Sequence, residues 1–481
     1  MLLIGEMLAH AARVSPTAVA ATLDDEVLTF GELEFRAARL ANGLRSIGVG
    51  RGDRVLWWSD TALEAVPIFA ALGRLGAVFA PLNARSTVEE LIDVAQYARP
   101  TLLLAGRSHV DAGAELARAA GVPFSATVPE DVSGSPSRTD VDERDPHVIF
   151  FTSGSTGRPK GVVLSHRANW LRTFVGATTS AGGAGTVCMF PLFHMAGWTI
   201  AMGAWQGRRA VHFVRTPDAE TLLHTVVRHR AARLYCIPAV WARVLEHGVG
   251  RFDLSSLSEA DTGTSATPPE LLRALKDALP HTVTRVFYGS TEAGPGLQLS
   301  HGDLVRKPGS VGLAQPAVDA RLDPDGEVCV RSPFLMDGYF DDPGATATAL
   351  RDGWYHTGDL GAFDDEGYLS IVGRARDVIR TGGETVAPVE VEHVLASHPA
   401  IAEVAVVGFP DPQWGEIVTA VVVARPGTVA PDAAAIRTFC DGRLAPYKQP
   451  RRVAVVDALP RTAATGQVQR PLIVERLLAS G

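Results

Sequence analysis

The pattern of apolar and polar positions switches repeatedly between a helical period and short continuous apolar runs. In the first 125 residues, helical patterns such as 1–16 and 29–47 alternate with short apolar runs such as 54–58 and 101–104. Apolar residues three and four apart indicate a helix with one buried face, and a short apolar run bounded by polar residues indicates a buried strand. The alternation predicts α/β layers in a large N-terminal domain.

The pattern changes twice towards the C-terminus. Residues 321–372 have the alternation of short strands, with turns at 324–326 and 365–367, and predict a small β subdomain. After residue 376 we expect a compact α+β unit: helix 389–397, strands 403–408 and 417–424, helix 431–443 and strand 452–457. The polar segment 130–146 reads as an exposed linker. The predicted domains are therefore 1–375 and 376–481.

Composition excludes several classes of function. A chain of 481 residues exceeds one hydrophobic core, and its apolar fraction of 46% is ordinary for a globular protein. A net charge of −8 without a basic run argues against nucleic acid or an anionic membrane as the partner. The N-terminal helix contains Glu6 and has no basic leader, and no apolar run approaches the roughly 20 residues of a membrane span. The four cysteines lie far apart, so we expect a cytoplasmic protein with free thiols.

Residues 151–161, FTSGSTGRPKG, carry the strongest chemical signal. They combine three glycines, four hydroxyl residues and Lys160 in one short loop between apolar segments. Backbone N–H groups and hydroxyls of such a loop can surround phosphate oxygens, and the lysine adds a point charge. A plain Gly/Ser turn is the alternative, but a turn needs few hydroxyl residues. We interpret the segment as a phosphate-binding loop.

This loop does not fit the best-known phosphate-binding patterns. From Gly154, Pro159 stands where the second glycine of a Walker A loop belongs, and Gly161 follows Lys160 where Ser or Thr belongs. Pro159 would also break the helix that a Walker loop opens into. The loop instead leads into Val162–Leu164, a predicted short strand followed by a helix.

Seven segments in order resemble the motifs of the acyl-adenylate-forming superfamily, which includes acyl-CoA synthetases, adenylation domains and luciferases. They are FFTSGSTGRPKGVVLSH (150–166), PLFHMAGW (191–198), YGSTE (288–292), WYHTGDLG (354–361), GRARDVIRTGGETVAPVEVE (373–392), VVGFPDPQWGE (406–416) and LPRTAATGQVQR (459–470). The resemblance implies a large N-terminal domain, a small mobile C-terminal domain and a two-step reaction. A carboxylate attacks the α-phosphate of ATP to give acyl-AMP and pyrophosphate, and a thiol, usually CoA, then displaces AMP.

The resemblance assigns nucleotide and metal contacts to residues from several motifs. Thr291 would touch the α-phosphate, Tyr288 would stack on adenine, and Glu292 with Thr156 would hold Mg²⁺, which prefers hard oxygen ligands. Asp359 would accept hydrogen bonds from the ribose hydroxyls, and Arg374 would donate to the sugar or phosphate. The other implied nucleotide contacts are Thr152, Ser153, Gly154, Ser155, Gly157, Lys160, Gly263, Thr264, Ser265 and Gly289. Ordinary roles remain as alternatives: a solvated Glu292, a turn-capping Asp359 and a surface ion pair of Arg374.

Further assignments concern the acyl group and the thiol. By resemblance, His194 lies near the acyl-AMP carbonyl and the thiol entrance, although a histidine among apolar residues is often a core group. The expected acyl pocket consists of small or apolar residues, among them Gly182, Gly183, Ala196, Gly197, Trp198, Thr262 and Ala293, Gly294, Pro295, Gly296. Neither Lys nor Arg falls in these segments, so a dicarboxylate is disfavoured.

The C-terminal domain is expected to supply the hinge and the CoA contacts. Arg376 is the implied hinge residue. Gly382, Gly383 and Glu384 would line the pantetheine tunnel, with an ordinary hairpin turn as the alternative. Arg451 and Arg452 are candidates for the CoA phosphates, with an exposed charge pair as the alternative.

One position departs from the family pattern. The last motif carries a lysine after glycine in the family, and this chain has Gln467 there. That lysine bridges the substrate carboxylate and the α-phosphate during adenylation and leaves when the C-terminal domain rotates. Glutamine cannot neutralise charge, and losing one such stabiliser costs on the order of 10²–10³ in rate. Lys448 is nineteen residues away and could replace it only by rearrangement.

The sequence therefore predicts an AMP-forming acyl-CoA ligase for a bulky hydrophobic monocarboxylic acid, weak in adenylation and competent in thioester formation. Its expected ligands are ATP or acyl-AMP, CoA and Mg²⁺. A separate adenylating enzyme is a candidate partner, and a homodimer is left open. Two alternatives stand: a complete ATP-dependent CoA ligase for aromatic or medium-chain acids, and a non-catalytic acyl-AMP or nucleotide-binding protein. Transfer to a carrier-protein thiol is a further option.

Overall fold

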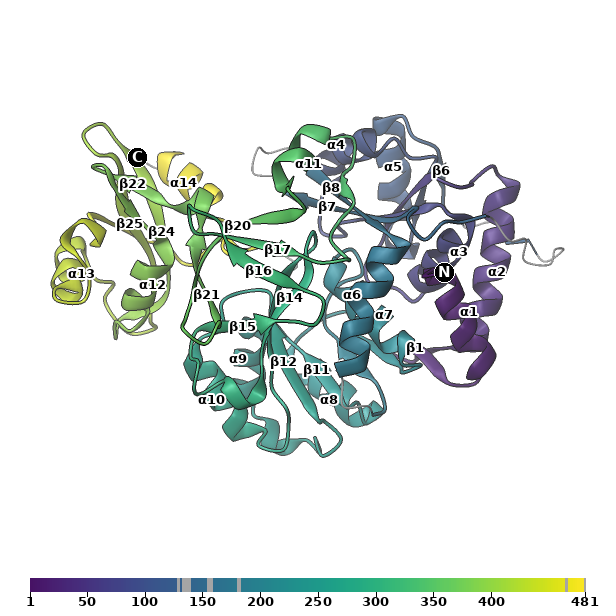
Figure 1. The fold of residues 1–481 in the computed structure, drawn as a ribbon, viewed down its shortest axis with the longest axis horizontal. Coiled ribbons are helices and arrows are strands. Elements are labelled where there is room, and N and C mark those ends of the chain that lie inside the picture. The colour runs from purple at the N-terminus through teal and green to yellow at the C-terminus, as the bar shows by residue number, and fades with distance from the viewer. Residues whose placement is uncertain (128–129, 132–139, 154–158, 180–182, 463–465, 480–481) are drawn as a thin grey trace. The chain divides into compact units, whose positions relative to one another are not determined.

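The computed structural model describes residues 1–127, 130–131, 140–153, 159–179, 183–462 and 466–479. The chain divides into two compact units (Figure 1). The N-terminal unit comprises Met1–Gly309, Ala314–Asp319 and Val330–Tyr355, and the C-terminal unit comprises Ser310–Leu313, Ala320–Cys329 and His356–Gly481. The predicted α/β class, with a large N-terminal and a small C-terminal domain, is confirmed.

One sheet of the N-terminal unit carries the predicted phosphate loop. Its strand order is β18-β8-β7-β4-β3-β5-β6, parallel from β7 to β6 and antiparallel at β7–β8 and β8–β18. The bounds are β3 (Arg54–Trp58), β4 (Val78–Leu82), β5 (Leu102–Ala105), β6 (Phe124–Ser125), β7 (Pro146–Ser153), β8 (Pro159–Ser165) and β18 (Gly338–Tyr339). Strand β4 is buried at every position, as expected of a parallel strand with both faces covered. The strands predicted at 54–58 and 101–104 are β3 and β5.

The other sheet of this unit runs β14-β13-β12-β11-β9-β10-β1-β2 and is parallel from β13 to β1. Its strands are β1 (Val19–Leu23), β2 (Glu26–Thr29), β9 (Thr186–Cys188), β10 (Val211–Phe213), β11 (Arg233–Tyr235), β12 (Glu259–Gly263), β13 (Val286–Ser290) and β14 (Gly294–Leu299). The motif YGSTE begins on β13 and continues into the turn before β14. The N-terminal unit therefore carries both motifs. The predicted phosphate loop connects β7 and β8 of one sheet, and YGSTE begins on β13 of the other.

Helices cover these sheets, and local sequence signals set several of their ends. Thr29 and Glu32 form a capping box at α2, and Thr87 with Glu90 forms another at α4. The helices are α1 (Ile4–Val14), α2 (Phe30–Ser46), α3 (Ala65–Leu75), α4 (Val88–Ala98), α5 (Val110–Ala120), α6 (His166–Thr179), α7 (Met195–Gln206), α8 (Ala219–His229), α9 (Pro238–His247), α10 (Pro269–Ala278) and α11 (Pro343–Ala349), with 3₁₀ turns at Arg107–His109, Val249–Arg251 and His301–Asp303. Among the described residues, none of the helices has the length and apolarity to span a membrane.

The C-terminal unit contains two groups of strands. The first has the order β16-β17-β20-β21-β15; β19 pairs with Trp354 and Tyr355 at the start of β20, and these residues belong to the N-terminal unit. The second has the order β23-β22-β25-β24, with β26 beside β25. The bounds are β15 (Ser310–Ala314), β16 (Asp319–Leu322), β17 (Glu327–Arg331), β19 (Leu350–Arg351), β20 (Trp354–Phe363), β21 (Leu369–Arg374), β22 (Ile379–Thr381), β23 (Glu384–Val386), β24 (Ile401–Asp411), β25 (Gly415–Ala424) and β26 (Arg452–Val455).

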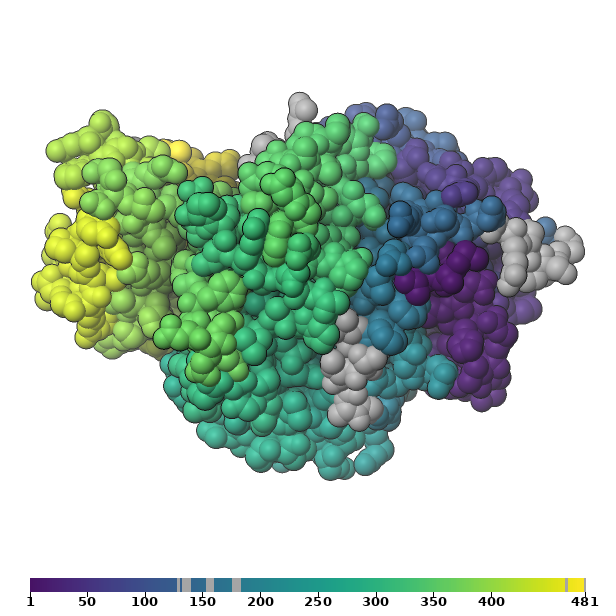
Figure 2. Space-filling view, viewed as in Figure 1, coloured from purple at the N-terminus to yellow at the C-terminus, as the bar shows by residue number. Residues whose placement is uncertain are grey.

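The helices of the C-terminal unit are short and amphipathic. They are α12 (Pro388–Ala396), α13 (Ala433–Cys440) and α14 (Arg470–Ala479), with 3₁₀ turns at Ala375–Asp377 and Pro446–Lys448. Residues towards the C-terminal end of the chain, coloured yellow, form part of the visible surface in Figure 2. Within this unit, Ile436 and Cys440 of α13 are buried in an apolar core with Val406 and Val422. The order helix, strand, strand, helix, strand predicted after residue 376 is confirmed, with ends shifted by at most three residues.

The division by contacts differs from the boundary expected after residue 375. Strands β20 and most of β17 and β15 group with the C-terminal residues, because β20 and β21 pair along their length. The turns predicted at 324–326 and 365–367 are present, with Gly326 and Gly367 at φ 83° and 82°. A mobile domain that begins after residue 375, hinged at Arg376, stays a prediction.

Candidate active site

The phosphate loop closes a β-hairpin. Strands β7 and β8 pair Thr152 with Lys160 and Ser153 with Pro159, and Thr152 Oγ1 donates to the Lys160 carbonyl at 3.4 Å. Gly154, Ser155, Thr156 and Gly157, on which the phosphate and metal contacts were predicted, lie outside the described residues, as does the Ser153 side chain. The hairpin thus fixes the two ends of the loop.

Lys160 and Glu292 both contact Tyr339. Lys160 Nζ lies 4.8 Å from the Tyr339 ring centroid, and the Tyr339 hydroxyl donates to Glu292 Oε1 at 3.2 Å. Burial and the Glu292 charge raise the pKa of Tyr339, so it remains a neutral donor. Tyr355, also buried, has a raised pKa for the same reasons. The structure therefore joins a cation of the phosphate loop to the predicted metal ligand through a phenol that the sequence analysis missed.

The turn that carries Thr291 and Glu292 is tight. A Cβ at Gly289 would lie 2.2 Å from the Gly294 carbonyl oxygen, and Gly294 has φ 70°. Arg172 Nη1 donates to the Thr291 carbonyl at 3.0 Å. Gly289 and Gly294 are thus required by close approach and by left-handed backbone, respectively. Arg172 lies beside the predicted acyl pocket, which the sequence segments alone did not indicate.

Gly263, Thr264 and Ser265, three of the predicted nucleotide contacts, form a segment with an unusual backbone. Gly263 has φ 150°, and a Cβ there would lie 2.2 Å from the Phe287 carbonyl oxygen. Thr264 has φ 65°, a left-handed conformation that a β-branched residue rarely adopts, and its hydroxyl donates to the Gly263 carbonyl at 2.6 Å. Ser265 follows in the same loop, and Tyr288 on β13 is partly exposed. Such strained conformations are common at functional sites, which supports a ligand-facing role for this loop.

A buried ion network holds the strands beneath that loop. Asp261 accepts from Arg233 Nε at 2.7 Å and from Arg285 Nε at 2.9 Å, and Arg285 also pairs with Glu259. Trp241 Nε1 donates to the Asp261 carbonyl at 2.8 Å. Every carboxylate here is paired, as buried charges must be. The network ties β11, β12 and β13 together just before Thr262 and Gly263.

His194 caps helix α7. Its Nδ1 accepts from Ala196 N at 3.1 Å, and burial lowers its pKa to about 4, so the ring is neutral with its proton on Nε2. Thr262 is buried, and its hydroxyl has no hydrogen-bond partner among the described residues. Trp198 is fully buried, stacks on Phe69 at 4.1 Å and donates to the Leu192 carbonyl. Trp198 therefore packs in the core, and lining a pocket would require its neighbours to move.

In the C-terminal unit, Asp359 and Arg374 lie opposite each other on β20 and β21. Arg374 Nε is 3.1 Å from Asp359 Oδ1, and the Asp359 amide donates to Thr357 Oγ1. The carboxylate is largely buried whereas the guanidinium is partly exposed. The nucleotide contacts expected of these two residues stay a prediction, and the ion pair itself matches the alternative given for Arg374.

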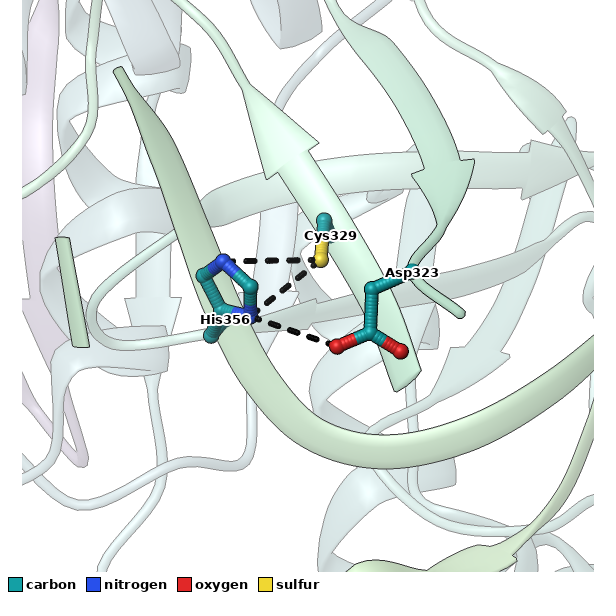
Figure 3. A group of neighbouring side chains, drawn as sticks. All are labelled: Asp323, Cys329 and His356. Carbon is teal, nitrogen blue, oxygen red and sulfur yellow. Dashed lines mark hydrogen bonds and ion pairs between the residues drawn. The ribbon is translucent and has the colours of Figure 1, made fainter. Parts of the chain in front are cut away.

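A cluster of Asp323, Cys329 and His356 lies on the same strands (Figure 3). The His356 Nδ1 atom lies 3.0 Å from Glu327 Oε2 and 3.4 Å from Cys329 Sγ. Glu327 Oε1 accepts from Gly358 N at 2.7 Å, and Asp323 Oδ1 accepts from two amides of its turn. These side chains are engaged with one another and with the backbone that leads to Asp359. They could hold a soft divalent ion, but their hydrogen bonds explain the arrangement without one.

The Gly382–Gly383 segment is a two-residue hairpin turn between β22 and β23. Both glycines have positive φ, 59° and 87°, as such turns require. A Cβ at Gly382 would lie 2.6 Å from Trp414 Cε3, and the Arg451 guanidinium lies 3.9 Å from the Trp414 ring centroid on a cation–π contact. The hairpin alternative is thus the observed local structure. It brings Gly382 and Arg451, both predicted CoA contacts, to one tryptophan, while Glu384 is exposed.

Gln467 lies at the closing end of a short loop. Its backbone N–H donates to Thr462 Oγ1 at 3.0 Å, and its backbone carbonyl accepts from the Thr462 backbone N–H at 2.8 Å. Lys448, which the sequence suggested as a distant substitute, bonds Glu390 at 2.6 and 2.8 Å, and this contact raises its pKa. Arg376 lies in a 3₁₀ turn 3.6 Å from Asp377, and Arg452 lies over the Phe409 ring.

The C-terminal unit and the N-terminal unit thus each bring together part of the predicted site. Lys160, Thr291 and Glu292 share one environment, and Asp359 and Arg374 share another. The side chains missed from the sequence are Arg172, Tyr339 and Tyr355. Tyr355 stands inside the motif WYHTGDLG and could have been chosen from it, whereas Arg172 and Tyr339 are brought in only by the fold.

Comparison with known proteins identifies the family. The family described as AMP-binding enzyme matches residues 8–340, and the AMP-binding enzyme C-terminal domain matches 390–465. A feruloyl-CoA synthase of an Amycolatopsis species is 35% identical, covering 97% of this chain and 98% of its own. The 3-[(3aS,4S,7aS)-7a-methyl-1,5-dioxo-octahydro-1H-inden-4-yl]propanoyl:CoA ligase of Mycobacterium tuberculosis is 36% identical, covering 96% of each.

A solved structure agrees with these relatives over nearly the whole chain. The crystal structure of ATP-bound MatB from Rhodopseudomonas palustris has a TM-score of 0.88 at 30% identity and covers 98% of both chains. Family models, relatives and fold agree, so this chain belongs to the AMP-binding enzyme family and is an AMP-forming acid–thiol ligase that acts on a carboxylic acid, ATP or AMP, and CoA.

Proposed function

We propose that this ligase forms acyl-AMP slowly but converts a supplied acyl-AMP to acyl-CoA efficiently. The observation that carries the proposal is Gln467 at the position where the family resemblance places the adenylation lysine. During adenylation, negative charge builds up between the attacking carboxylate and the α-phosphate. A neutral amide can donate one hydrogen bond there but cannot neutralise that charge.

Lys448 does not offer a ready replacement. Its ammonium group pairs with the Glu390 carboxylate, in the same C-terminal unit as Gln467, and lies 5.7 Å from the Tyr447 ring centroid. Moving Lys448 to the nucleotide would break this ion pair. Among the described residues of the C-terminal unit, it is the one lysine. We therefore expect the deficit at Gln467 to remain uncompensated from this unit.

The second half-reaction needs other groups, and these are present. The CoA sulfur attacks the acyl carbonyl, a C–S bond forms, and AMP leaves with the electrons of the broken C–O bond. Asp359 and Arg374 would hold the ribose and phosphate of the departing AMP, and Thr291 would contact its phosphate. Gly382, Gly383, Glu384 and Arg451 would bind CoA, and neutral His194 would face the thiol entrance. Gln467 is not required for this step.

Mg²⁺ would serve the adenylation step through Glu292 and Thr156. The Glu292 carboxylate fits a hard cation because Tyr339 holds one of its oxygens by a neutral hydrogen bond and brings no competing positive charge. A bound Mg²⁺ would neutralise phosphate charge on ATP. Thr156 would add a hydroxyl oxygen from the phosphate loop.

For the substrate, we propose a bulky hydrophobic monocarboxylic acid. The pocket segments are rich in small residues, and a Cβ at Gly296 would meet no atom of the described residues closer than 3.6 Å, whereas Gly183 and Gly294 are already closely packed. Two relatives are named for bulky acyl groups, one aromatic and one bicyclic. Arg172 borders Gly294, but its two terminal nitrogens already donate to backbone carbonyls. Its Nε has no hydrogen-bond partner among the described residues but is buried, so the guanidinium is not exposed to a second carboxylate.

A complete ATP-dependent ligase for aromatic or medium-chain acids is the second candidate, favoured by the names of the relatives. The two candidates separate in one experiment with wild-type protein. Pyrophosphate release from ATP and acid is compared with thioester formation from the synthetic acyl-AMP and CoA, over a panel of acids. Our proposal expects thioester formation to be faster by on the order of 10²-fold or more. Equal, fast rates would establish the complete ligase, and a separate adenylating enzyme would then be unnecessary.

A further inference from the structure

Arg172 is a buried cation that connects two distant segments of the N-terminal unit. It lies on α6 with 1% of its surface exposed. Nη1 donates to the Thr291 carbonyl at 3.0 Å, and Nη2 donates to the Phe334 carbonyl at 2.7 Å. These acceptors are 119 and 162 residues away in sequence. One guanidinium therefore fixes the distance between the YGSTE turn and the segment that begins at Phe334.

The two segments joined by Arg172 also hold Glu292 directly. The Met336 amide donates to the Glu292 carbonyl at 2.8 Å, and the Tyr339 hydroxyl donates to its carboxylate at 3.2 Å. Arg172 thus contacts the backbone of the turn at Thr291, and the Phe334–Tyr339 segment binds the adjacent Glu292. If the guanidinium were removed, the Thr291 and Phe334 carbonyls would each lose a hydrogen-bond donor, and the position of Glu292 would be less well fixed.

Charge makes this support strong. Burial lowers the pKa of Arg172 to about 10, while Asp337 and Glu292 oppose the shift, so the guanidinium is protonated at neutral pH. Hydrogen bonds from a charged donor are roughly twice as strong as neutral ones. A buried charge is costly unless it is hydrogen-bonded in a defined geometry. A neutral side chain of the same length would fill the space but leave the carbonyls unpaired.

We propose that Arg172 is a positioning residue of the ligase: it sets the Thr291–Glu292 turn for the α-phosphate and the metal without touching the substrate. The roles of Thr291 and Glu292 rest on the proposed function. The placement of the turn by Arg172 rests on the contacts above. Misplacing a reacting group by about 1 Å can cost on the order of 10²-fold in rate.

Two variants of Arg172 and one control test this role. Arg172→Met keeps the length and removes the donors, and Arg172→Lys keeps the charge with one point donor. Thr173→Val on the same helix removes a hydroxyl that donates to Asn169 and Trp170 instead of the turn. Measurements are AMP affinity by calorimetry, the Mg²⁺ concentration for half-maximal pyrophosphate release, and kcat and KM for thioester formation from acyl-AMP.

We expect Arg172→Met to lower kcat for thioester formation by on the order of 10²-fold, with a weaker AMP affinity and a higher Mg²⁺ requirement. Arg172→Lys should recover part of each loss, and Thr173→Val should keep wild-type values. If Arg172→Met does not fold, a folded Arg172→Lys with a raised Mg²⁺ requirement supports the proposal. Folded Arg172 variants with wild-type AMP affinity and Mg²⁺ dependence would overturn it. Equal losses in Thr173→Val would also overturn it, because they would indicate a purely structural role. If wild-type protein forms no thioester, the proposed function fails while the AMP calorimetry still decides the role of Arg172.

Discussion

At the scale of single residues, a side-chain partner orients each of two carboxylates. Tyr339 donates to Glu292, and Arg374 pairs with Asp359. An ionised carboxyl offers about four lone-pair sites, so one such contact does not saturate it. The two side chains are thus oriented before a ligand arrives, which reduces the entropy lost on binding.

This arrangement predicts unequal effects of two substitutions. Glu292→Gln removes the anionic ligand and should lower Mg²⁺-dependent pyrophosphate release by on the order of 10²-fold, as for loss of a charge stabiliser. Tyr339→Phe removes one neutral hydrogen bond, worth about 1 kcal/mol, and should cost less than tenfold. Rates measured across a Mg²⁺ titration provide the comparison. A Glu292→Gln enzyme with wild-type Mg²⁺ dependence would contradict the metal assignment.

A second residue-scale prediction concerns the buried His166 at the start of α6. Its Nδ1 accepts from the Ile4 amide, and burial lowers its folded pKa from 6.5 to about 4. Above the unfolded pKa this group costs no stability. As pH falls from about 6.5 towards 4, the unfolded chain takes up the proton first and stability is lost. Between pH 7 and pH 5, that loss is up to about 2 kcal/mol.

Urea unfolding at the two pH values measures this loss. His166→Gln should show a smaller decrease in stability between pH 7 and pH 5 than the wild type. His10→Gln, at an exposed position of α1, is the matched control and should keep the wild-type decrease. An unchanged pH dependence in His166→Gln would show that this histidine is not the group responsible.

The site residues that the sequence could supply were those carried by motifs. Glu292, Asp359 and Arg374 stand in recognisable segments, and the structure pairs the last two with each other, which is the alternative given for Arg374. Arg172 and Tyr339 stand outside any chosen motif, and their role depends on contacts across more than a hundred residues or on a strand pairing. Periodicity and spacing carry no information about such contacts, which arise only when the sheet and α6 are assembled.

At the scale of elements, the β22–β23 hairpin shows how one turn can position several groups. Gly382 and Gly383 adopt left-handed backbone, but only Gly382 packs against Trp414. Arg451 lies over the same ring. The turn conformation therefore decides where two predicted CoA contacts lie.

The two glycines form a matched pair of tests. A left-handed alanine costs roughly 1–2 kcal/mol at either position. Gly382→Ala also forces a Cβ onto Trp414, and overpacking adds about 1–3 kcal/mol. Hydrogen exchange of residues 379–386 should therefore accelerate more in Gly382→Ala than in Gly383→Ala, with a larger rise in KM for CoA. Equal effects would show that the contact with Trp414 is unimportant.

The sequence largely predicted the helices and strands themselves, whereas it did not predict which of them lie side by side. The helix expected at 29–47 has a capping box at Thr29, and the strand at 54–58 is bounded by polar residues, so local signals sufficed. The pairing of β18 with β8, which brings Tyr339 towards the phosphate loop, joins segments far apart in sequence. A strand of two residues, such as β18, is too short for its apolar and polar positions to predict such pairing.

At the scale of the whole molecule, the two units divide the predicted machinery. The N-terminal unit carries Lys160, Thr291 and Glu292, and the C-terminal unit carries Asp359, the Gly382 hairpin and Gln467. The proposed defect in adenylation, at Gln467, thus lies in the C-terminal unit alone. Restoring a lysine there should correct one half-reaction and leave the other unchanged.

The most direct measurement is pyrophosphate release by Gln467→Lys relative to the wild type, with ATP and the acid. We predict a rise on the order of 10²–10³-fold, with thioester formation from acyl-AMP changed by less than about threefold. Gln469→Lys, which adds the same charge two residues away, should give no such rise. Unchanged pyrophosphate release in a folded Gln467→Lys enzyme, or an equal rise in Gln469→Lys, would contradict the claim that Gln467 limits adenylation.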